Sequence, residues 1–137
     1  MRIVSVVVSR SLEDCWRVFT DHEDLPKWVP GLREAHLVEF DIEGLPYEIR
    51  FLYAAGLEYA LRYTYDTENW VLRWEPVDED GKRGGVRGFA RFDEVEGGTQ
   101  VTYALEHDKG RKAPERALDN PQQLVDAFAN FMHEDRG

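Results

Sequence analysis

The chain of 137 residues is 42% hydrophobic and 12% aromatic, which suits one domain with a real apolar core and excludes a disordered composition. Its 17 basic and 27 acidic residues give a formal net charge of −10, which argues against a broad nucleic-acid surface and against docking on an anionic membrane. The one cysteine, Cys15, excludes an intrachain disulfide. We expect one domain over residues 1–137, in the cytoplasm, with no secretory signal and no membrane-spanning stretch.

The first part of the chain predicts a strand followed by two short helices. The segment Ile3 to Val8 is rich in β-branched residues, which favours a strand. Ser11 is placed to cap a helix whose apolar residues recur at helical spacing, at Leu12, Cys15, Trp16 and Phe19. A second short helical piece is expected over Asp21 to Lys27, with Pro26 and Pro30-Gly31 ending it.

From Glu34 onward the apolar period becomes two, which predicts six antiparallel strands joined by short turns. Three apolar rows are expected on one face of the sheet: Tyr47/Ile49/Phe51, Leu57/Tyr59/Leu61/Tyr63 and Trp70/Leu72/Trp74. The alternating charged residues, such as Arg62 and Arg73, are expected on the other face. A charged loop over 78–85 precedes the last two strands, Val86 to Asp93 and Thr99 to Glu106.

The C-terminal part predicts a closing helix. Asn120-Pro121 supplies a cap and a proline at the first helical position, and Leu124, Phe128, Phe131 and Met132 then share a face. The segment from His107 to Asp119 is highly charged and is either a loop or a partial helix, so the extent of helix before Pro121 stays open.

The segment from Ser11 to Gly31 resembles the opening signature of the polyketide cyclase/dehydrase and lipid-transport superfamily, which includes START-like and Bet v 1-like (SRPBCC) proteins. The matching features are Phe19, Asp21 and the run Pro26-Lys27-Trp28, and the hairpin from Gly88 to Tyr103 is similar to the family's last hairpin. The resemblance implies an α+β helix-grip fold, in which a curved antiparallel sheet of about seven strands wraps a C-terminal helix and two short helices follow the first strand. Pro121 departs from the family's long, uninterrupted last helix.

A wide curved sheet leaves a hollow that one helix cannot fill, so side chains or a ligand must occupy it. Buried tyrosine hydroxyls need partners, which favours a cavity with an apolar wall and polar points. We expect the cavity to be lined by Trp28, Phe51, Tyr59, Leu61, Tyr63, Trp74, Phe89 and Phe128, with packed core as the alternative for each residue. Arg87 and Arg91 are candidate anchors for a carboxylate or phenolate, provided that their strand turns this face inward, which the sequence does not fix.

The sequence carries no recognisable catalytic or metal-binding motif. His22, His36, His107 and His133 lack metal-ligand spacing, and the glycine-rich run Gly84 to Gly88 leads into a strand, where no helix amides would cradle a phosphate. We therefore predict no metal and no cofactor, and assign no catalytic residue. Mutating Tyr63 to Ala is expected to weaken binding of an apolar dye.

Three functions remain open, and the resemblance implies each of them. The favoured one is binding or transport of a hydrophobic small molecule, such as a lipid, polyketide or isoprenoid. The second is an enzyme of the cyclase or dehydratase type. The third is a protein-interaction module of the chaperone-cofactor or ribosome-binding type. The ligand and the oligomeric state are not predicted.

Overall fold

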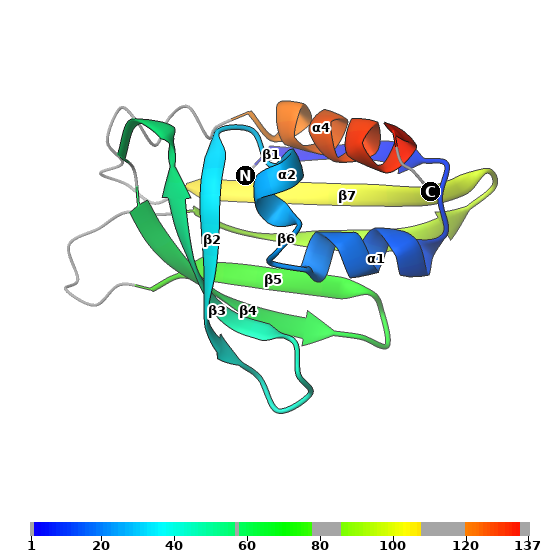
Figure 1. Ribbon diagram of the computed structural model, residues 1–137. Helices are drawn as coiled ribbons and strands as arrows, with labels where there is room; N and C mark the ends of the chain where they lie inside the picture. The colour runs from blue at the N-terminus through cyan, green and yellow to red at the C-terminus, as the bar shows by residue number, and fades with distance from the viewer. Residues whose placement is uncertain (1, 57, 78–85, 108–119, 135–137) are drawn as a thin grey trace.

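The computed structural model describes residues 2–56, 58–77, 86–107 and 120–134. Within these ranges the chain forms seven strands and three α-helices, in the order that the sequence predicts: a strand, two short helices, six strands and a helix (Figure 1). The elements are β1 (Arg2–Val8), α1 (Leu12–Thr20), α2 (Leu25–Trp28), β2 (Leu32–Phe40), β3 (Pro46–Tyr53), the 3-10 helix η1 (Ala54–Gly56), β4 (Glu58–Asp66), β5 (Val71–Pro76), β6 (Val86–Val95), β7 (Gly98–His107) and α4 (Pro121–Glu134).

The strands form one antiparallel sheet in the order β1-β7-β6-β5-β4-β3-β2. Consecutive strands from β2 to β7 pair as neighbours, and β1 joins at the far edge by pairing with β7. The helices α1 and α2 therefore carry the chain from one edge of the sheet to the other. This topology confirms the expected α+β architecture of a curved sheet with a closing C-terminal helix.

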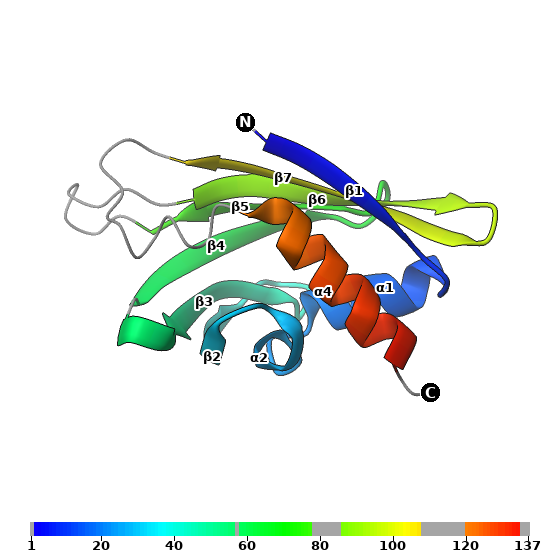
Figure 2. The ribbon, with the colours of Figure 1, turned by 90° about the horizontal axis from the view of Figure 1, so that it is seen from above.

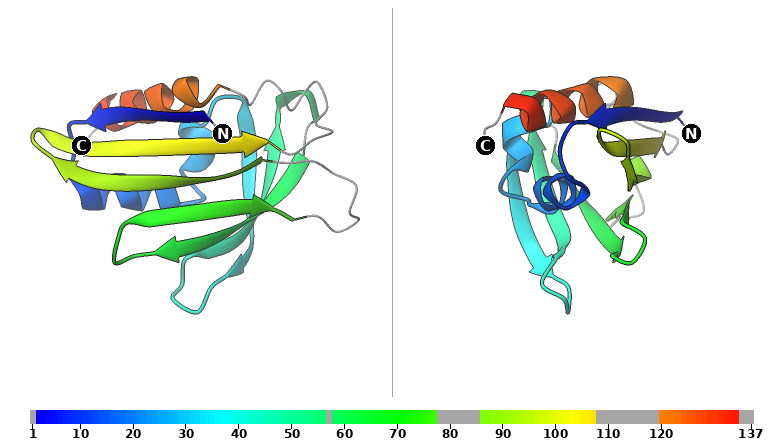
Figure 3. Two further views of the ribbon diagram at one scale, coloured as in Figure 1. Left: turned by 180° about the vertical axis from the view of Figure 1, so that it is seen from behind. Right: turned by 90° about the vertical axis from the view of Figure 1, so that its right-hand side faces the viewer.

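The helices lie on the concave side of the sheet. Seen from above, α4 runs across the opening while α1 and α2 lie beside it (Figure 2). In the right-hand view of Figure 3, α1 appears end-on inside the curve of the sheet. α4 packs on β1 and β7, α1 packs on β6 and β7, and α2 packs on β2 and α4. In the left-hand view, no helix of the described part of the chain covers the convex face.

The predicted starts of α1 and α4 are confirmed by their caps. The Ser11 hydroxyl accepts a hydrogen bond from the Asp14 backbone N–H at 3.1 Å, which satisfies one of the unpaired amides at the start of α1. Asn120 does the same for the Gln123 N–H at 3.0 Å, and Pro121 occupies the first position of α4. Pro121 therefore begins this helix and does not break it, because a first-turn proline has no backbone hydrogen bond to lose.

The core consists of aromatic rings from the helices packed on the sheet. The Phe19 ring lies 5.3 Å from that of Phe92 and 5.2 Å from that of Phe128, both edge to face. Trp16 lies 5.5 Å from Phe92 in the same geometry. Such pairs stabilise the interior beyond the area they bury, by about 0.5–1.5 kcal/mol each.

Three sequence predictions need correction. The second helix begins at Leu25, with Pro26 in its first turn, so Pro26 does not end it. Trp70 precedes β5 in a turn with φ of +57°, so it is not the first residue of the strand. Tyr47 lines a pocket with outer-face residues, because the β2–β3 pairing shifts register around Glu39 and Phe40. The predictions for residues 57, 78–85 and 108–119 lie outside the described residues.

No helix among the described residues combines the length and the apolar character needed to cross a lipid bilayer.

Candidate functional site

A small recess lies between the concave face of the sheet and the helices. Its volume is about 60 Å³, roughly the space of two water molecules. The sheet contributes rings and aliphatic groups from β3, β4, β5 and β7, and each helix contributes apolar side chains. The lining residues are Phe19, Leu25, Trp28, Val29, Phe51, Tyr53, Tyr59, Leu61, Tyr63, Trp74, Tyr103 and Leu124.

The recess is small because aromatic rings fill the hollow of the sheet. Trp28 packs 4.9 Å from the Phe128 ring and 5.3 Å from the Phe19 ring. On the sheet side, Trp74 lies 5.2 Å from Tyr103. The protein's own side chains therefore occupy most of the space on the concave side of the sheet, and only the small recess is left between them.

Four tyrosines give the apolar recess a polar wall. The Tyr59 hydroxyl donates a hydrogen bond to the Tyr53 hydroxyl at 3.2 Å, and their rings stack at 5.6 Å. Tyr63 and Tyr103 line the same recess, and their hydroxyls have no hydrogen-bond partner among the described residues. Besides burial, the neighbouring Tyr53 phenol raises the pKa values of Tyr59, Tyr63 and Tyr103.

Trp28 adds a further polar group without a partner. Trp28 is only 6% exposed, and its indole Nε1–H makes no hydrogen bond with any described residue. A buried donor left unpaired costs about 1–3 kcal/mol, so native proteins rarely keep one without a use. Trp28, Tyr63 and Tyr103 all line the recess, so three residues whose donor groups lack a partner among the described residues border the same space.

The tyrosines of the recess stay protonated far above neutral pH. Burial away from water disfavours the phenolate and raises the pKa values of Tyr53, Tyr59, Tyr63 and Tyr103 above the ordinary value of 10.0. No carboxyl, histidine, lysine or arginine side chain is among the described residues that line the recess. The phenols of the recess can therefore donate hydrogen bonds at neutral pH.

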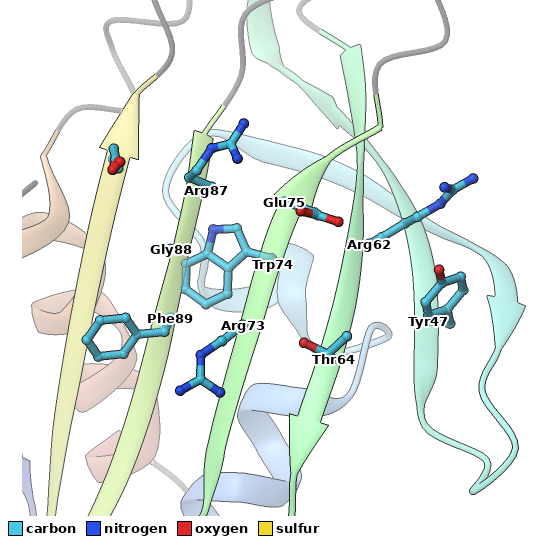
Figure 4. Close-up of a pocket in the computed structure, with 10 residues that line it drawn as sticks. Tyr47, Arg62, Thr64, Arg73, Trp74, Glu75, Arg87, Gly88 and Phe89 are labelled. Carbon is cyan, nitrogen blue, oxygen red and sulfur yellow. The ribbon is translucent and has the colours of Figure 1, made fainter.

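A second and larger pocket lies on the outer face of the sheet. Its volume is about 330 Å³, and Figure 4 shows its side chains rising from neighbouring strands. Its lining residues are Tyr47, Arg62, Thr64, Arg73, Trp74, Glu75, Arg87, Gly88, Phe89 and Glu106. The β5–β6 pairing ends at Trp74 and Gly88, and Trp74 lines this pocket as well as the recess.

Six of the eight residues expected in the cavity line the recess, namely Trp28, Phe51, Tyr59, Leu61, Tyr63 and Trp74. Phe128 is fully buried against Trp28 and Phe19 but is not among the lining residues. Phe89 lies instead in the outer pocket, because Ala90 and Phe92 take the buried face of β6 and neighbouring residues of a strand point to opposite faces.

Neither candidate anchor reaches the recess. Arg87 lines the outer pocket with Phe89. Arg91 is exposed, and its Nε donates to the Asp93 carboxylate at 2.9 Å. The strand turns its arginine face outward, so neither side chain can neutralise an anion bound beside the helices.

The outer pocket as a whole was not predicted from the sequence, and neither were six residues of the recess, namely Phe19, Leu25, Val29, Tyr53, Tyr103 and Leu124. Tyr103 alternates along its strand with Val101 and Leu105, and all three side chains are buried. The apolar alternation could therefore have predicted that Tyr103 faces the interior. The outer pocket depends on how the strands from β3 to β7 align with one another. The apolar period of a single strand does not predict this alignment. Among the described residues, no group of three histidine, cysteine, aspartate or glutamate side chains could hold a metal ion.

The chain is similar to known proteins in its fold. No protein-family model and no curated protein matches the chain. Solved structures do match. A START superfamily protein from Mycobacterium smegmatis superposes with a TM-score of 0.76 at 16% identity, covering 97% of both chains. A protein from Thermus thermophilus gives 0.75 at 17% identity, covering 96% of this chain and 95% of that one.

The chain has the START-like helix-grip fold. The di-domain ARO/CYC protein StfQ from the steffimycin biosynthetic pathway has it too, with a TM-score of 0.70 at 12% identity. This match covers 95% of the present chain and 44% of StfQ.

Proposed function

We propose that this START-like chain binds a hydrophobic small molecule that carries a hydrogen-bond-accepting oxygen, in the recess beneath α4. The observation that carries the proposal is that Trp28, Tyr63 and Tyr103, which line the recess beside apolar walls, have donor groups without a hydrogen-bond partner among the described residues. An acceptor such as a ketone or quinone oxygen would satisfy them. The site has no cation among its described lining residues, so a neutral ligand suits it better than a carboxylate.

Binding requires the recess to widen. A volume of about 60 Å³ holds no more than a fragment, whereas small-molecule sites usually span roughly 300–1,000 Å³. The groups best placed to move are Trp28 on the four-residue helix α2 and Leu124 on α4, since both line the recess from the helix side. We expect a ligand to displace these side chains while the sheet keeps its shape.

A binding role is favoured over catalysis by the chemistry of the lining. The titratable residues among the described lining are tyrosines whose pKa values are raised, so they hold their protons at neutral pH. These phenols can polarise a carbonyl group, which would fit a reaction like that of the ARO/CYC proteins with the same fold. A cyclisation that begins by removing a proton also needs a base.

The test compares two bicyclic probes, 1-tetralone and tetralin, which differ by one carbonyl oxygen. Isothermal titration should give tighter binding of tetralone to the natural chain. Replacing Tyr63 and Tyr103 by Phe removes the hydroxyls and keeps the rings, so tetralone should bind about five- to tenfold more weakly while tetralin is unaffected.

Tyr47→Phe is the matched control, because that phenol lines the outer pocket and should leave both affinities unchanged. Equal binding of the two probes to the natural chain, or tetralone binding that survives loss of both hydroxyls, would refute the proposal.

A further inference from the structure

The outer pocket holds three arginines, whose surroundings differ. Glu75 on β5 lies directly across from Arg62, and the Arg62 Nε also donates to Glu48 at 2.9 Å. Glu106 on β7 lies directly across from Arg87. Opposite charges at facing positions of adjacent strands interact favourably, so these two arginines stand beside carboxylates of the protein itself.

Arg73 stands between two uncharged neighbours. Its cross-strand partner on β4 is Thr64, and its partner on β6 is Phe89. Figure 4 shows the Arg73 side chain between these two residues. Arg73 is exposed and makes no ion pair or hydrogen bond with any described residue. The pKa of Asp66 is lowered by its hydrogen bonds with Asn69, and Arg73 is a further cause.

The walls around this guanidinium are aromatic. Phe89 flanks Arg73, Trp74 reaches the pocket where the β5–β6 pairing ends, and Tyr47 lies on the far side. The Tyr47 ring already receives the Arg62 guanidinium at 5.9 Å from its centre. A planar ligand ring can therefore contact side-chain rings while a charged substituent reaches Arg73 and the Thr64 hydroxyl.

We propose that the outer pocket binds a small planar aromatic monoanion, such as an arene carboxylate, with Arg73 as the residue that pairs with its charge. A guanidinium matches a carboxylate with two parallel hydrogen bonds. The volume of about 330 Å³ suits a bicyclic ring system. Glu75 and Glu106 in the same pocket repel additional negative charge, which disfavours phosphate esters and polyanions. This site lies on the opposite face of the sheet from the recess and does not depend on it.

The experiment is a titration with 2-naphthoate, followed by isothermal calorimetry and by amide chemical shifts. Saturable binding is expected, with the largest shifts at Thr64, Arg73 and Phe89. Arg73→Met should weaken binding at least tenfold, and Arg73→Lys should weaken it less because it keeps the charge without the planar fork. The neutral analogue 2-naphthamide and the dianion 2-naphthyl phosphate should each bind the natural chain at least fivefold more weakly.

Arg91→Met is the matched control. Arg91 lies two residues beyond Phe89 on the same strand, is also exposed and does not line the pocket, so its loss should change the affinity less than twofold. Absence of saturable binding, an affinity unchanged by Arg73→Met, or shifts centred on Tyr63 and Tyr103 would each overturn the proposal. The last result would leave the recess proposal standing, so the two proposals fail separately.

Discussion

Gly88 leaves room for the ring of Trp74, which lines both pockets. A Cβ placed on Gly88 would collide with the Ala104 carbonyl oxygen and would lie 3.0 Å from Trp74 Cζ2. Backbone cannot move aside cheaply in a paired strand, and Trp74 is itself held against Tyr103. A side chain at this position therefore has to displace either β7 or the indole that lines both pockets.

We expect Gly88→Ala to lower the free energy of unfolding by about 2–3 kcal/mol, as overpacking of a filled interior does. Urea denaturation measures the change. Gly44→Ala provides the comparison, because Gly44 has φ of +86° but a Cβ added to it would meet nothing within 4 Å, so only backbone strain of about 1 kcal/mol applies. Equal losses in the two variants would contradict the close approach at Gly88.

At the scale of elements, the corner between β1 and α1 holds the end of α4. The Ser9 N–H donates to His133 Nε2 at 2.9 Å, and Arg10 Nη1 donates to the Met132 carbonyl at 2.9 Å. The last carbonyls of a helix have no partner inside the helix, and the Arg10 bond to Met132 satisfies one of them. The Ser9 bond attaches the His133 side chain to the same corner. The corner is fixed in turn by Thr99, whose hydroxyl donates to the Arg10 carbonyl at 2.8 Å.

Arg10→Met should loosen the last turn of α4. We expect amide exchange of residues 131–134 to accelerate about fivefold and the unfolding free energy to fall by about 1 kcal/mol, the usual net value of a lost hydrogen bond. Hydrogen exchange read by NMR would show it. Arg17→Met is the control, since Arg17 bonds the same Asp14 that Arg10 also bonds and is far more exposed. Equal acceleration in both variants would mean that the contact with Met132 does not hold the helix.

Some elements could be predicted from the sequence and others could not. The starts of α1 and α4 were predictable, because a cap is a local interaction between residues three apart. The start of α2 was not, because Pro26 both ends helices and is tolerated in a first turn. The facing of β6 needed its pairing with β5 and β7, so Phe89 and Arg87 could not be assigned to a face from their own strand.

For the whole molecule, element order and period were enough to predict the architecture. The sequence predicts a strand, two short helices, six segments with a two-residue apolar period and a final helix. Few other folds have this order of elements. The volume of the recess was not predictable in the same way. It depends on the angles at which Trp28, Trp74 and Phe128 pack, and small changes in ring position decide whether a hollow is filled or open.

The buried thiol and phenol groups of the interior make the stability of the whole fold sensitive to high pH. Burial raises the pKa of the Cys15 thiol from 9.0 to about 11. It also raises the pKa values of Tyr53, Tyr59, Tyr63 and Tyr103 above 10.0. Above about pH 9–10 the unfolded chain gives up protons that the folded chain retains, so the unfolded state binds fewer protons and stability falls as the pH rises.

We expect the unfolding free energy to be insensitive to these groups below about pH 8.5, to decline from about pH 9 as the unfolded-state thiol ionises, and to fall steeply above about pH 10. Each tyrosine that stays protonated in the folded state adds up to about 1.4 kcal/mol per pH unit to the slope. Absorbance of tyrosinate at 295 nm should therefore rise in the same step as the loss of circular dichroism. Titration of these phenols near pH 10 with the fold intact would mean that water reaches the recess freely, and the aromatic packing that closes it would then have to be looser than the ring distances imply.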